Sequence, residues 1–326
     1  MSHFCSLCQD LEHGPYCVKH GVVHQQFAVG TRFDVLELIG SGAVSHVFGG
    51  RERATGRRVA IRLLRPAAAH DGDGERRFLA DAEALCGVRH DAVAEMIAAG
   101  WDPAIEAAYA VSERLAGQPA DVALRAHGPL PWRRVVSLLA QLVRGVEALH
   151  AAGIADGNLT THKVALCADA DGERAIFTDA GLATAGTAEP RDDVYGIGTI
   201  GHELLTGRLP LEGGSAAGLL SDDPVRIAER FGAIEVPAGL DELIRACRVR
   251  DPLLRPALGE LSAALAGLGA VVPGPRRRGD ADGASDVASI DGTGPVPREA
   301  SAFGGSAWDL PAAPAPSPVR GRSEER

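Results

Sequence analysis

The sequence predicts an α+β fold, with a small β-rich part followed by a larger helical part. Three short apolar runs separated by turns are typical of strands, and they cover residues 33–39, 44–48 and 58–64. A long run with the spacing of an amphipathic helix extends from Pro131 to His150. Further helices are predicted over residues 75–88, 240–249 and 258–268.

Composition narrows the class of protein. Of the 326 residues, 45% are hydrophobic and 23% are charged, which is ordinary for a soluble globular protein. The net charge of −10 disfavours nucleic acid as a partner, because such partners favour a basic surface. No apolar run approaches the roughly 20 residues needed to span a bilayer, and no signal-like segment is present. We therefore expect a cytoplasmic protein without a membrane span.

The first 26 residues contain two pairs of potential metal ligands. Cys5 and Cys8 form the first pair, and Cys17 and His20 form the second. Zn²⁺ binds four nitrogen or sulfur ligands in a tetrahedron, and two tight turns can supply two each. So short a segment buries no core, so metal would have to hold it together. We predict a zinc-ribbon-like segment over residues 1–26. A tail with incidental cysteines is the alternative, and the competitors of His20 as fourth ligand are His3, His13 and His24.

A glycine-rich turn separates the first two predicted strands. Gly40 and Gly42 would let backbone N–H groups approach a phosphate without obstruction by a Cβ atom. Alone this signal is weak, since a tight hairpin also needs glycines. The third strand carries Arg62 among apolar neighbours, which argues against a mere surface arginine.

These motifs, in this order, resemble the catalytic domain of bacterial serine/threonine protein kinases. The resemblance covers about residues 33–268 and rests on Gly40-Ser41-Gly42, Val59-Ala60-Ile61, Asp179-Ala180-Gly181 and Asp251-Pro252-x-x-Arg255-Pro256. It implies a bilobal kinase-like domain over residues 33–270, with an N-lobe to about residue 115 and a C-lobe from about residue 116. Some bacterial kinase domains are preceded by a similar zinc ribbon. The nucleotide-binding residues that the resemblance implies are Gly40, Gly42, Val47, Ala60, Arg62, Glu113, Leu115 and Asp179.

The catalytic loop departs from the family's pattern. Where the family reads H-R-D-L-K-P-x-N, this chain has Asp156-Gly157-Asn158-Leu159-Thr160-Thr161-His162-Lys163. Asn158 stands at the position of the catalytic base, and an amide is no base at neutral pH. Thr160 replaces the lysine that steadies the transferring phosphate. Lys163 replaces the asparagine that binds the second Mg²⁺, so a cation occupies a cation's place. None of the catalytic residues of this loop is intact.

Outside the catalytic loop, some positions of the implied site differ from the family and one is retained. Arg62 replaces the phosphate-pairing lysine, and Ser45 replaces the third glycine. The implied ion-pair partner of Arg62 is Asp81, where the family has a glutamate; a charged, solvated helix face is the alternative. Asp179 is retained and is a candidate Mg²⁺ ligand, with a turn-forming aspartate as the alternative.

The segment after Gly181 is shortened. Only eleven residues separate Gly181 from Asp193, whereas the family has a much longer activation segment that docks the protein substrate. The family's arginine at position 255 pairs with a glutamate at the end of that segment, and we expect Arg255 to use Glu189 instead. Residues 273–326 hold 8 of the 20 prolines, which predicts a disordered tail.

Taken with these losses, the resemblance predicts a pseudokinase that works as a scaffold or allosteric regulator in signalling. Its partners would be other proteins, an active kinase among them. Zinc is the expected structural cofactor, whereas ATP would bind weakly and Mg²⁺ would add little. The first alternative is a divergent active serine/threonine kinase, or a weak ATPase, that uses Arg62, Asp179 and Lys163. The second is a zinc-ribbon adaptor whose kinase fold is purely structural.

Overall fold

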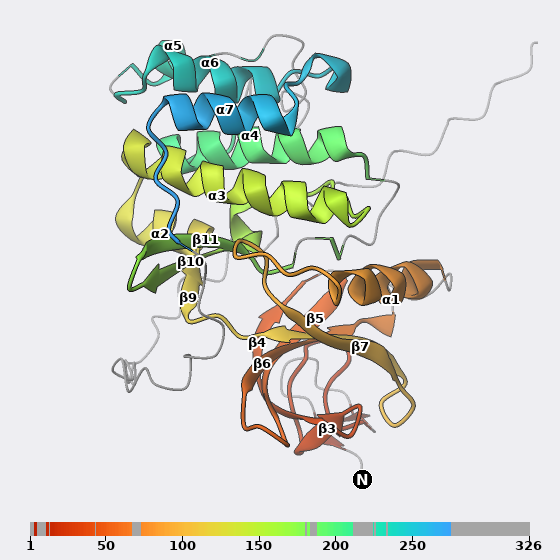
Figure 1. Cartoon of the computed structure of the whole chain (residues 1–326). Helices are drawn as coiled ribbons and strands as arrows, with labels where there is room; N and C mark the ends of the chain where they lie inside the picture. Colours follow the sequence, from red (N-terminus) through yellow and green to blue (C-terminus); the bar gives the residue numbers. More distant parts are fainter. Residues whose placement is uncertain are drawn as a thin grey trace, which may run out of the picture. The chain divides into compact units, whose positions relative to one another are not determined.

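The structure, a computed structural model, follows the predicted order of strands and helices (Figure 1). All described residues belong to one compact unit, Met1–Asp282. Cys5, Cys8, Ala180 and the predicted tail beyond residue 274 lie outside the described residues. The described residues are 3–4, 11–12, 14–42, 44–66, 73–179, 181–182, 188–210, 224, 226–232 and 234–274.

The β-rich part is an antiparallel sheet of six strands in the order β3-β4-β5-β6-β8-β7. Helix α1 (Asp73–Leu85) packs against β7 and β8. A separate hairpin joins β1 (His3–Phe4) and β2 (Leu11–Glu12). The six strands are β3 (Phe27–Val29), β4 (Phe33–Ser41), β5 (Ser45–Glu52), β6 (Arg58–Leu64), β7 (Met96–Asp102) and β8 (Ala107–Glu113).

One face of this sheet is covered by the segment that precedes β3. Successive side chains of a strand point to opposite faces, and Val59, Ile61 and Leu63 of β6 are fully buried on the same face. Tyr16 belongs to this cluster and stacks on Phe27, with 5.6 Å between the ring centroids. The N-terminal segment therefore adds to the core of the sheet and does not merely precede it.

The helical part is built around α3 (Trp132–Ala151) and α4 (Pro190–Thr206). Helix α7 packs on α3, and α6 packs on α4. A small sheet in the order β11-β10-β9 lies against α3. The remaining elements are β9 (Gly117–Pro119), α2 (Ala120–His127), η2 (Thr161–Lys163), β10 (Val164–Asp169), β11 (Gly172–Phe177), α5 (Ile227–Arg230), α6 (Ala238–Cys247), η5 (Pro252–Leu254) and α7 (Leu258–Gly267).

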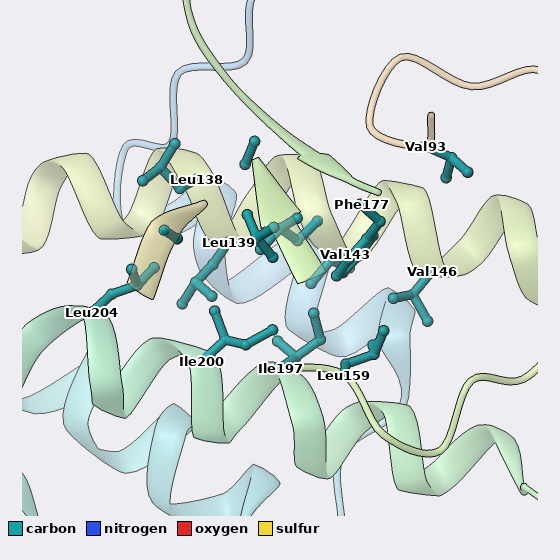
Figure 2. Close-up of a cluster of buried hydrophobic side chains, with 14 of the residues drawn as sticks. Val93, Leu138, Leu139, Val143, Val146, Leu159, Phe177, Ile197, Ile200 and Leu204 are labelled. Carbon is teal, nitrogen blue, oxygen red and sulfur yellow. The ribbon is translucent and has the colours of Figure 1, made fainter. Parts of the chain in front are cut away.

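Apolar side chains from α3 and α4 meet in the core of the helical part (Figure 2). Leu139 and Val143 of α3 face Ile197 and Ile200 of α4, and Phe177 at the end of β11 lies against α3. Phe177 is completely buried. Because the buried ring of Phe177 fixes the end of β11, it also fixes the point from which Thr178 and Asp179 extend.

The predicted α+β class, with a β-rich part followed by a helical part, is confirmed. The helix predicted over residues 131–150 is α3, and those predicted over residues 240–249 and 258–268 are α6 and α7. Strand β4 continues two residues further than predicted, to Ser41, and so includes part of the glycine-rich turn. No helix in the described part of the chain has the length and apolar character that crossing a membrane requires.

Candidate functional site

The glycine-rich turn lies in the hairpin between β4 and β5. Gly40 is opposite Val47, and the N–H of Gly42 donates to the carbonyl of Ser45 at 2.9 Å. Neither glycine has a positive φ, and a Cβ atom on Gly40 or Gly42 would meet its nearest neighbour at 3.8 or 3.7 Å, an ordinary contact. The hairpin itself therefore does not require these glycines. Their missing Cβ atoms instead favour the approach of an outside group such as a phosphate.

Arg62 joins this hairpin to the turn after β11. Its Nη1 donates to the hydroxyl of Ser45 at 2.8 Å, and its Nη2 forms an ion pair with Asp179. The two charged side chains are only 17% and 27% exposed. The sequence prediction paired Arg62 with Asp81, and the structure places Asp179 there instead. The guanidinium of Arg62 is thus paired with the carboxylate of Asp179, at the position where the family has an aspartate that binds Mg²⁺.

Asp81 lies on α1 with its side chain partly buried. Burial raises the pKa of Asp81 to about 6; Arg77 opposes this shift and the nearby Asp156 carboxylate adds to it. No ion pair between described residues includes Asp81, which fits a carboxyl group that binds its proton unusually tightly. An aspartate is one methylene shorter than the family's glutamate, and Arg62 has a nearer partner.

The loop between α3 and β10 is held by Asp193 of α4. The carboxylate of Asp193 is fully buried and accepts the backbone N–H groups of Asp156 (3.1 Å) and Gly157 (2.7 Å). The Nε2 atom of His150 donates to it at 2.8 Å. A buried carboxylate is stable only with such donors. Asp193 therefore fixes the backbone of the loop whose chemical side chains have changed.

Lys163 forms a buried ion pair within the same loop. Its Nζ atom lies 2.8 and 3.0 Å from the two carboxylate oxygens of Asp156, whose side chain is fully buried. Asp156 also accepts the N–H of Asn158 at 2.9 Å and that of Gly181 at 2.7 Å. The charge of Lys163 is therefore balanced inside the protein. The sequence interpretation treated Lys163 as a lone cation facing the metal site, and it missed this pairing.

The other two altered loop residues differ in their surroundings. Asn158 at the base position is exposed, and Thr160 is half-buried at the start of η2. Sequence reasoning could have found the Asp156–Lys163 pair, because a new carboxylate and a new ammonium appear seven residues apart in one loop. The sequence prediction treated the changes at positions 156 and 163 as independent of each other.

The residues predicted to surround the nucleotide base come from neighbouring strands. Val47 and Ala60 lie on the same face of the sheet, since Ala60 is opposite Gly49 and Gly49 is two residues from Val47. Glu113 at the end of β8 is buried, and its Oε1 accepts the N–H of Glu95 at 2.8 Å. Leu115 packs against a small buried cluster of Ala94, Ala165, Cys167 and Ile176. Glu113 thus contributes a structural contact through its side chain.

Two of the four predicted zinc ligands can be placed. Cys17 and His20 lie in one turn, with 3.7 Å between Sγ and Nδ1, and the N–H of His20 donates to Sγ at 3.3 Å. Cys5 and Cys8 lie outside the described residues. Within the described residues, no group of three or more His, Cys, Asp or Glu side chains is arranged to hold a metal.

The shortened segment leads directly into α4. Pro190 is the first residue of this helix, and the N–H of Glu189 donates to Asp192 at 3.1 Å. Arg255 was expected to pair with Glu189, and that expectation was wrong. Its Nη1 instead donates to the carbonyl of Arg191 at 2.7 Å and lies 3.4 Å from the carboxylate of Asp192. Arg255 thus contacts the first turn of α4.

Comparison with known proteins agrees with this geometry. Residues 33–188 match the protein kinase domain family. The kinase domain of Mycobacterium tuberculosis PknI superposes with a TM-score of 0.62 at 18% identity, over 74% of this chain and 97% of that domain. This is a protein kinase fold.

The sequence relatives are bacterial serine/threonine protein kinases. Kinase pkn2 of Myxococcus xanthus is 29% identical over 332 residues, which cover 87% of this chain and 39% of the relative. PrkC of Bacillus subtilis (strain 168) is 26% identical over 258 residues, covering 70% of this chain and 39% of the relative. The chain therefore spans about two fifths of the length of these two relatives. They support the resemblance to bacterial serine/threonine kinases.

The Asp156–Lys163 pair leads to a stability prediction. Lys163→Met should lower the free energy of unfolding by about 3 kcal/mol, because it leaves a buried carboxylate without its cation. Asp156→Asn in the Lys163→Met background should restore part of this loss, which a double-mutant cycle in urea will measure. Lys19→Met, at an exposed lysine, is the control and should stay within about 0.5 kcal/mol of the parent. An equal, small effect of both lysine variants would contradict the role of the pair.

The raised pKa of Asp81 predicts a pH dependence. The folded protein holds this proton more tightly than the unfolded chain, so its contribution to stability is present below about pH 4 and is lost as pH rises through about 6. Asp81→Asn should therefore match the parent at pH 4 and exceed its free energy of unfolding at pH 7. The gain should be about 1 kcal/mol, because the side chain is partly exposed to solvent. Urea unfolding at both pH values tests this; a pH-independent difference would contradict it.

Proposed function

We propose that this chain is a pseudokinase, which binds nucleotide without using Mg²⁺ and acts through protein contacts as a scaffold or allosteric regulator. The observation that carries the proposal is the ion pair between Arg62 and Asp179. In the kinase family the corresponding aspartate binds Mg²⁺, and the metal neutralises the phosphates. Here a guanidinium of the protein already neutralises that carboxylate.

The charge balance around Asp179 and Lys163 supports this proposal. The carboxylate of Asp179 has Arg62, and the ammonium of Lys163 has Asp156, so neither pair needs an added ion. A divalent cation at Asp179 would have to displace the guanidinium. Arg62 also contacts Ser45 of the phosphate-loop hairpin, and a guanidinium fork binds phosphate oxygens well. A nucleotide phosphate would therefore meet Arg62 in place of a metal.

Two further features support the absence of catalysis: the residue at the base position and the short segment before α4. The residue at the base position is Asn158, whose amide cannot take the proton of a substrate hydroxyl. Helix α4 begins at Pro190, eight residues after Leu182, which leaves little chain for a docking platform. These features weaken the alternative of an active kinase or ATPase, although the retained Asp179 and the Asp193-anchored loop keep it testable.

The N-terminal segment adds a structural zinc site to the proposal. Cys17 and His20 would supply two ligands, with Cys5 and Cys8 as the other two. The adaptor alternative, in which the kinase fold is purely structural, would keep this zinc site and bind no nucleotide. Nucleotide binding therefore separates the two.

We predict no phosphate transfer by the purified chain. Labelled ATP with Mg²⁺ or Mn²⁺ and a generic serine/threonine substrate should give no label above background, since no base is present at Asn158. Asp179→Ala serves as the control for contaminating kinases. Label that appears with the parent chain and disappears with Asp179→Ala would overturn the pseudokinase proposal.

We predict that ATP raises the melting temperature equally with and without Mg²⁺. The measurement is a thermal shift in buffer without added chelator, so that bound zinc is retained. Arg62→Met should make the shift depend on Mg²⁺, because Asp179 loses its guanidinium and can accept a metal. Arg58→Met, an exposed arginine on the same strand, should behave as the parent. A parent shift seen only with Mg²⁺ would contradict the proposal, and no shift at all would favour the adaptor alternative.

A further inference from the structure

The turn that holds Cys17 and His20 lies against the β4–β5 hairpin. This hairpin carries the Gly40-Ser41-Gly42 turn and is called the phosphate-loop hairpin below. The turn is closed by the N–H of Gly21, which donates to the carbonyl of Cys17 at 2.6 Å, and by the N–H of Cys17, which donates to the carbonyl of Val22 at 2.8 Å. The two central residues of the turn, Val18 and Lys19, direct their carbonyl groups toward the sheet, where both accept hydrogen bonds.

The geometry of this turn fits a zinc ion. Bond lengths of about 2.3 Å to sulfur and 2.0–2.1 Å to nitrogen place two tetrahedral ligands about 3.6 Å apart. The observed separation of Sγ of Cys17 and Nδ1 of His20 is 3.7 Å. A zinc ion bound to both atoms would close a chelate ring, and the middle residues of that ring are Val18 and Lys19.

His46 forms the first bridge from this ring to the hairpin. Its ring is buried, and its Nε2 donates to the carbonyl of Val18 at 2.9 Å. In the neutral ring Nδ1 is then an acceptor, and it lies 3.0 Å from the hydroxyl of Ser41. Ser41 is the central residue of the Gly40-Ser41-Gly42 turn. One imidazole thus contacts both the chelate ring and the phosphate loop.

Arg65 forms the second bridge. Its Nη2 donates to the carbonyl of Lys19 at 2.9 Å, and its Nη1 donates to the carbonyl of Gly42 at 2.8 Å. The two bridges therefore start at adjacent carbonyl groups in the chelate ring. They end at adjacent residues of the phosphate loop.

Gly21 brings the turn and the hairpin into close contact. Its φ of +73° is favourable only for glycine, and a Cβ atom there would lie 2.7 Å from Leu38 and 2.9 Å from Nδ1 of His46. The glycine after His20 thus both closes the turn and lets it reach the bridge. The turn is therefore in direct contact with side chains of both strands of the hairpin.

We propose that zinc bound at Cys17 and His20 fixes the phosphate-loop hairpin through His46 and Arg65, so that metal and nucleotide favour each other's binding. This inference rests on the zinc segment of the proposed function and adds a regulatory role to it. With zinc bound, the ring holds the carbonyl groups of Val18 and Lys19 in place. Without zinc only the hydrogen bonds of the turn hold these two carbonyl groups, so the acceptors of both bridges become less fixed. Because such coupling is reciprocal, a nucleotide that orders the hairpin must strengthen zinc binding equally.

Amide hydrogen exchange of the full chain tests the link without any activity measurement. Three samples are compared without nucleotide: protein as purified with its zinc content measured, protein stripped with a chelator, and stripped protein with zinc restored. Stripping should speed exchange over residues 14–24 and also, by about tenfold, over residues 40–42 and 44–48. Restoring zinc should reverse both changes. Adding ATP to the zinc form should then slow zinc loss to a chelator.

A double variant tests the route. Ser41→Ala with Arg65→Met removes the bonds that both bridges make to the Gly40-Ser41-Gly42 turn. It also removes the bond of Arg65 to the carbonyl of Lys19, whereas Cys17, His20 and the bond of His46 to the carbonyl of Val18 are kept. In this variant the response to zinc over residues 40–42 should be lost, while residues 14–24 still respond. Arg53→Met is the matched control, because Arg53 lies on the same sheet and its side chain bonds Asp34 and the carbonyl of Thr31. It should respond as the parent does.

Each other outcome overturns the inference in a recognisable way. A parent response confined to residues 14–24 keeps the zinc site and rejects the link. A double variant in which residues 40–42 respond as in the parent rejects the bonds of His46 to Ser41 and of Arg65 to Gly42 as the route. No zinc and no response in either segment rejects the zinc site and the link together, while the ATP thermal shift still decides separately whether the cleft binds nucleotide.

Discussion

The buried carboxylate of Asp193 is the contact on which the candidate site depends. It lies in the first turn of helix α4 and accepts two backbone N–H groups of the loop after α3. These bonds, together with that of His150, compensate the cost of burying a charge. The loop backbone is therefore fixed by the fold, and its chemical side chains were free to change without loss of that conformation.

A continuous set of polar contacts extends from this anchor to the sheet. The loop held by Asp193 places the carboxylate of Asp156 in the interior, where Lys163 neutralises it. Asp156 in turn accepts the N–H of Gly181, which lies two residues after the carboxylate that pairs with Arg62. Both lobes are thus joined by contacts between the protein's own charges. In an active kinase, metal ions and nucleotide phosphates supply part of this balance.

The sequence was sufficient for the fold, because periodicity and turn residues decide where elements form. It placed α3, α6 and α7 and the strands of the hairpin. It did not predict the pairs of Arg62 with Asp179 or Lys163 with Asp156, because partner choice depends on which side chains the fold brings within about 4 Å. The bonds of Arg255 at the start of α4 show the same limit, since the chain there is shortened and the family's geometry no longer applies.

The two internal ion pairs show that several substituted positions of the site compensate one another in charge. Removing a metal ligand alone would leave like charges or unpaired groups in a partly buried cleft, which is destabilising. Here the replacements at positions 62, 156 and 163 bring in the cations and the carboxylate that balance the site. Under the pseudokinase proposal, the site therefore holds its conformation without Mg²⁺. The same proposal leaves control of that conformation to other parts of the chain, and His46 and Arg65 connect the N-terminal turn to the Gly40-Ser41-Gly42 turn.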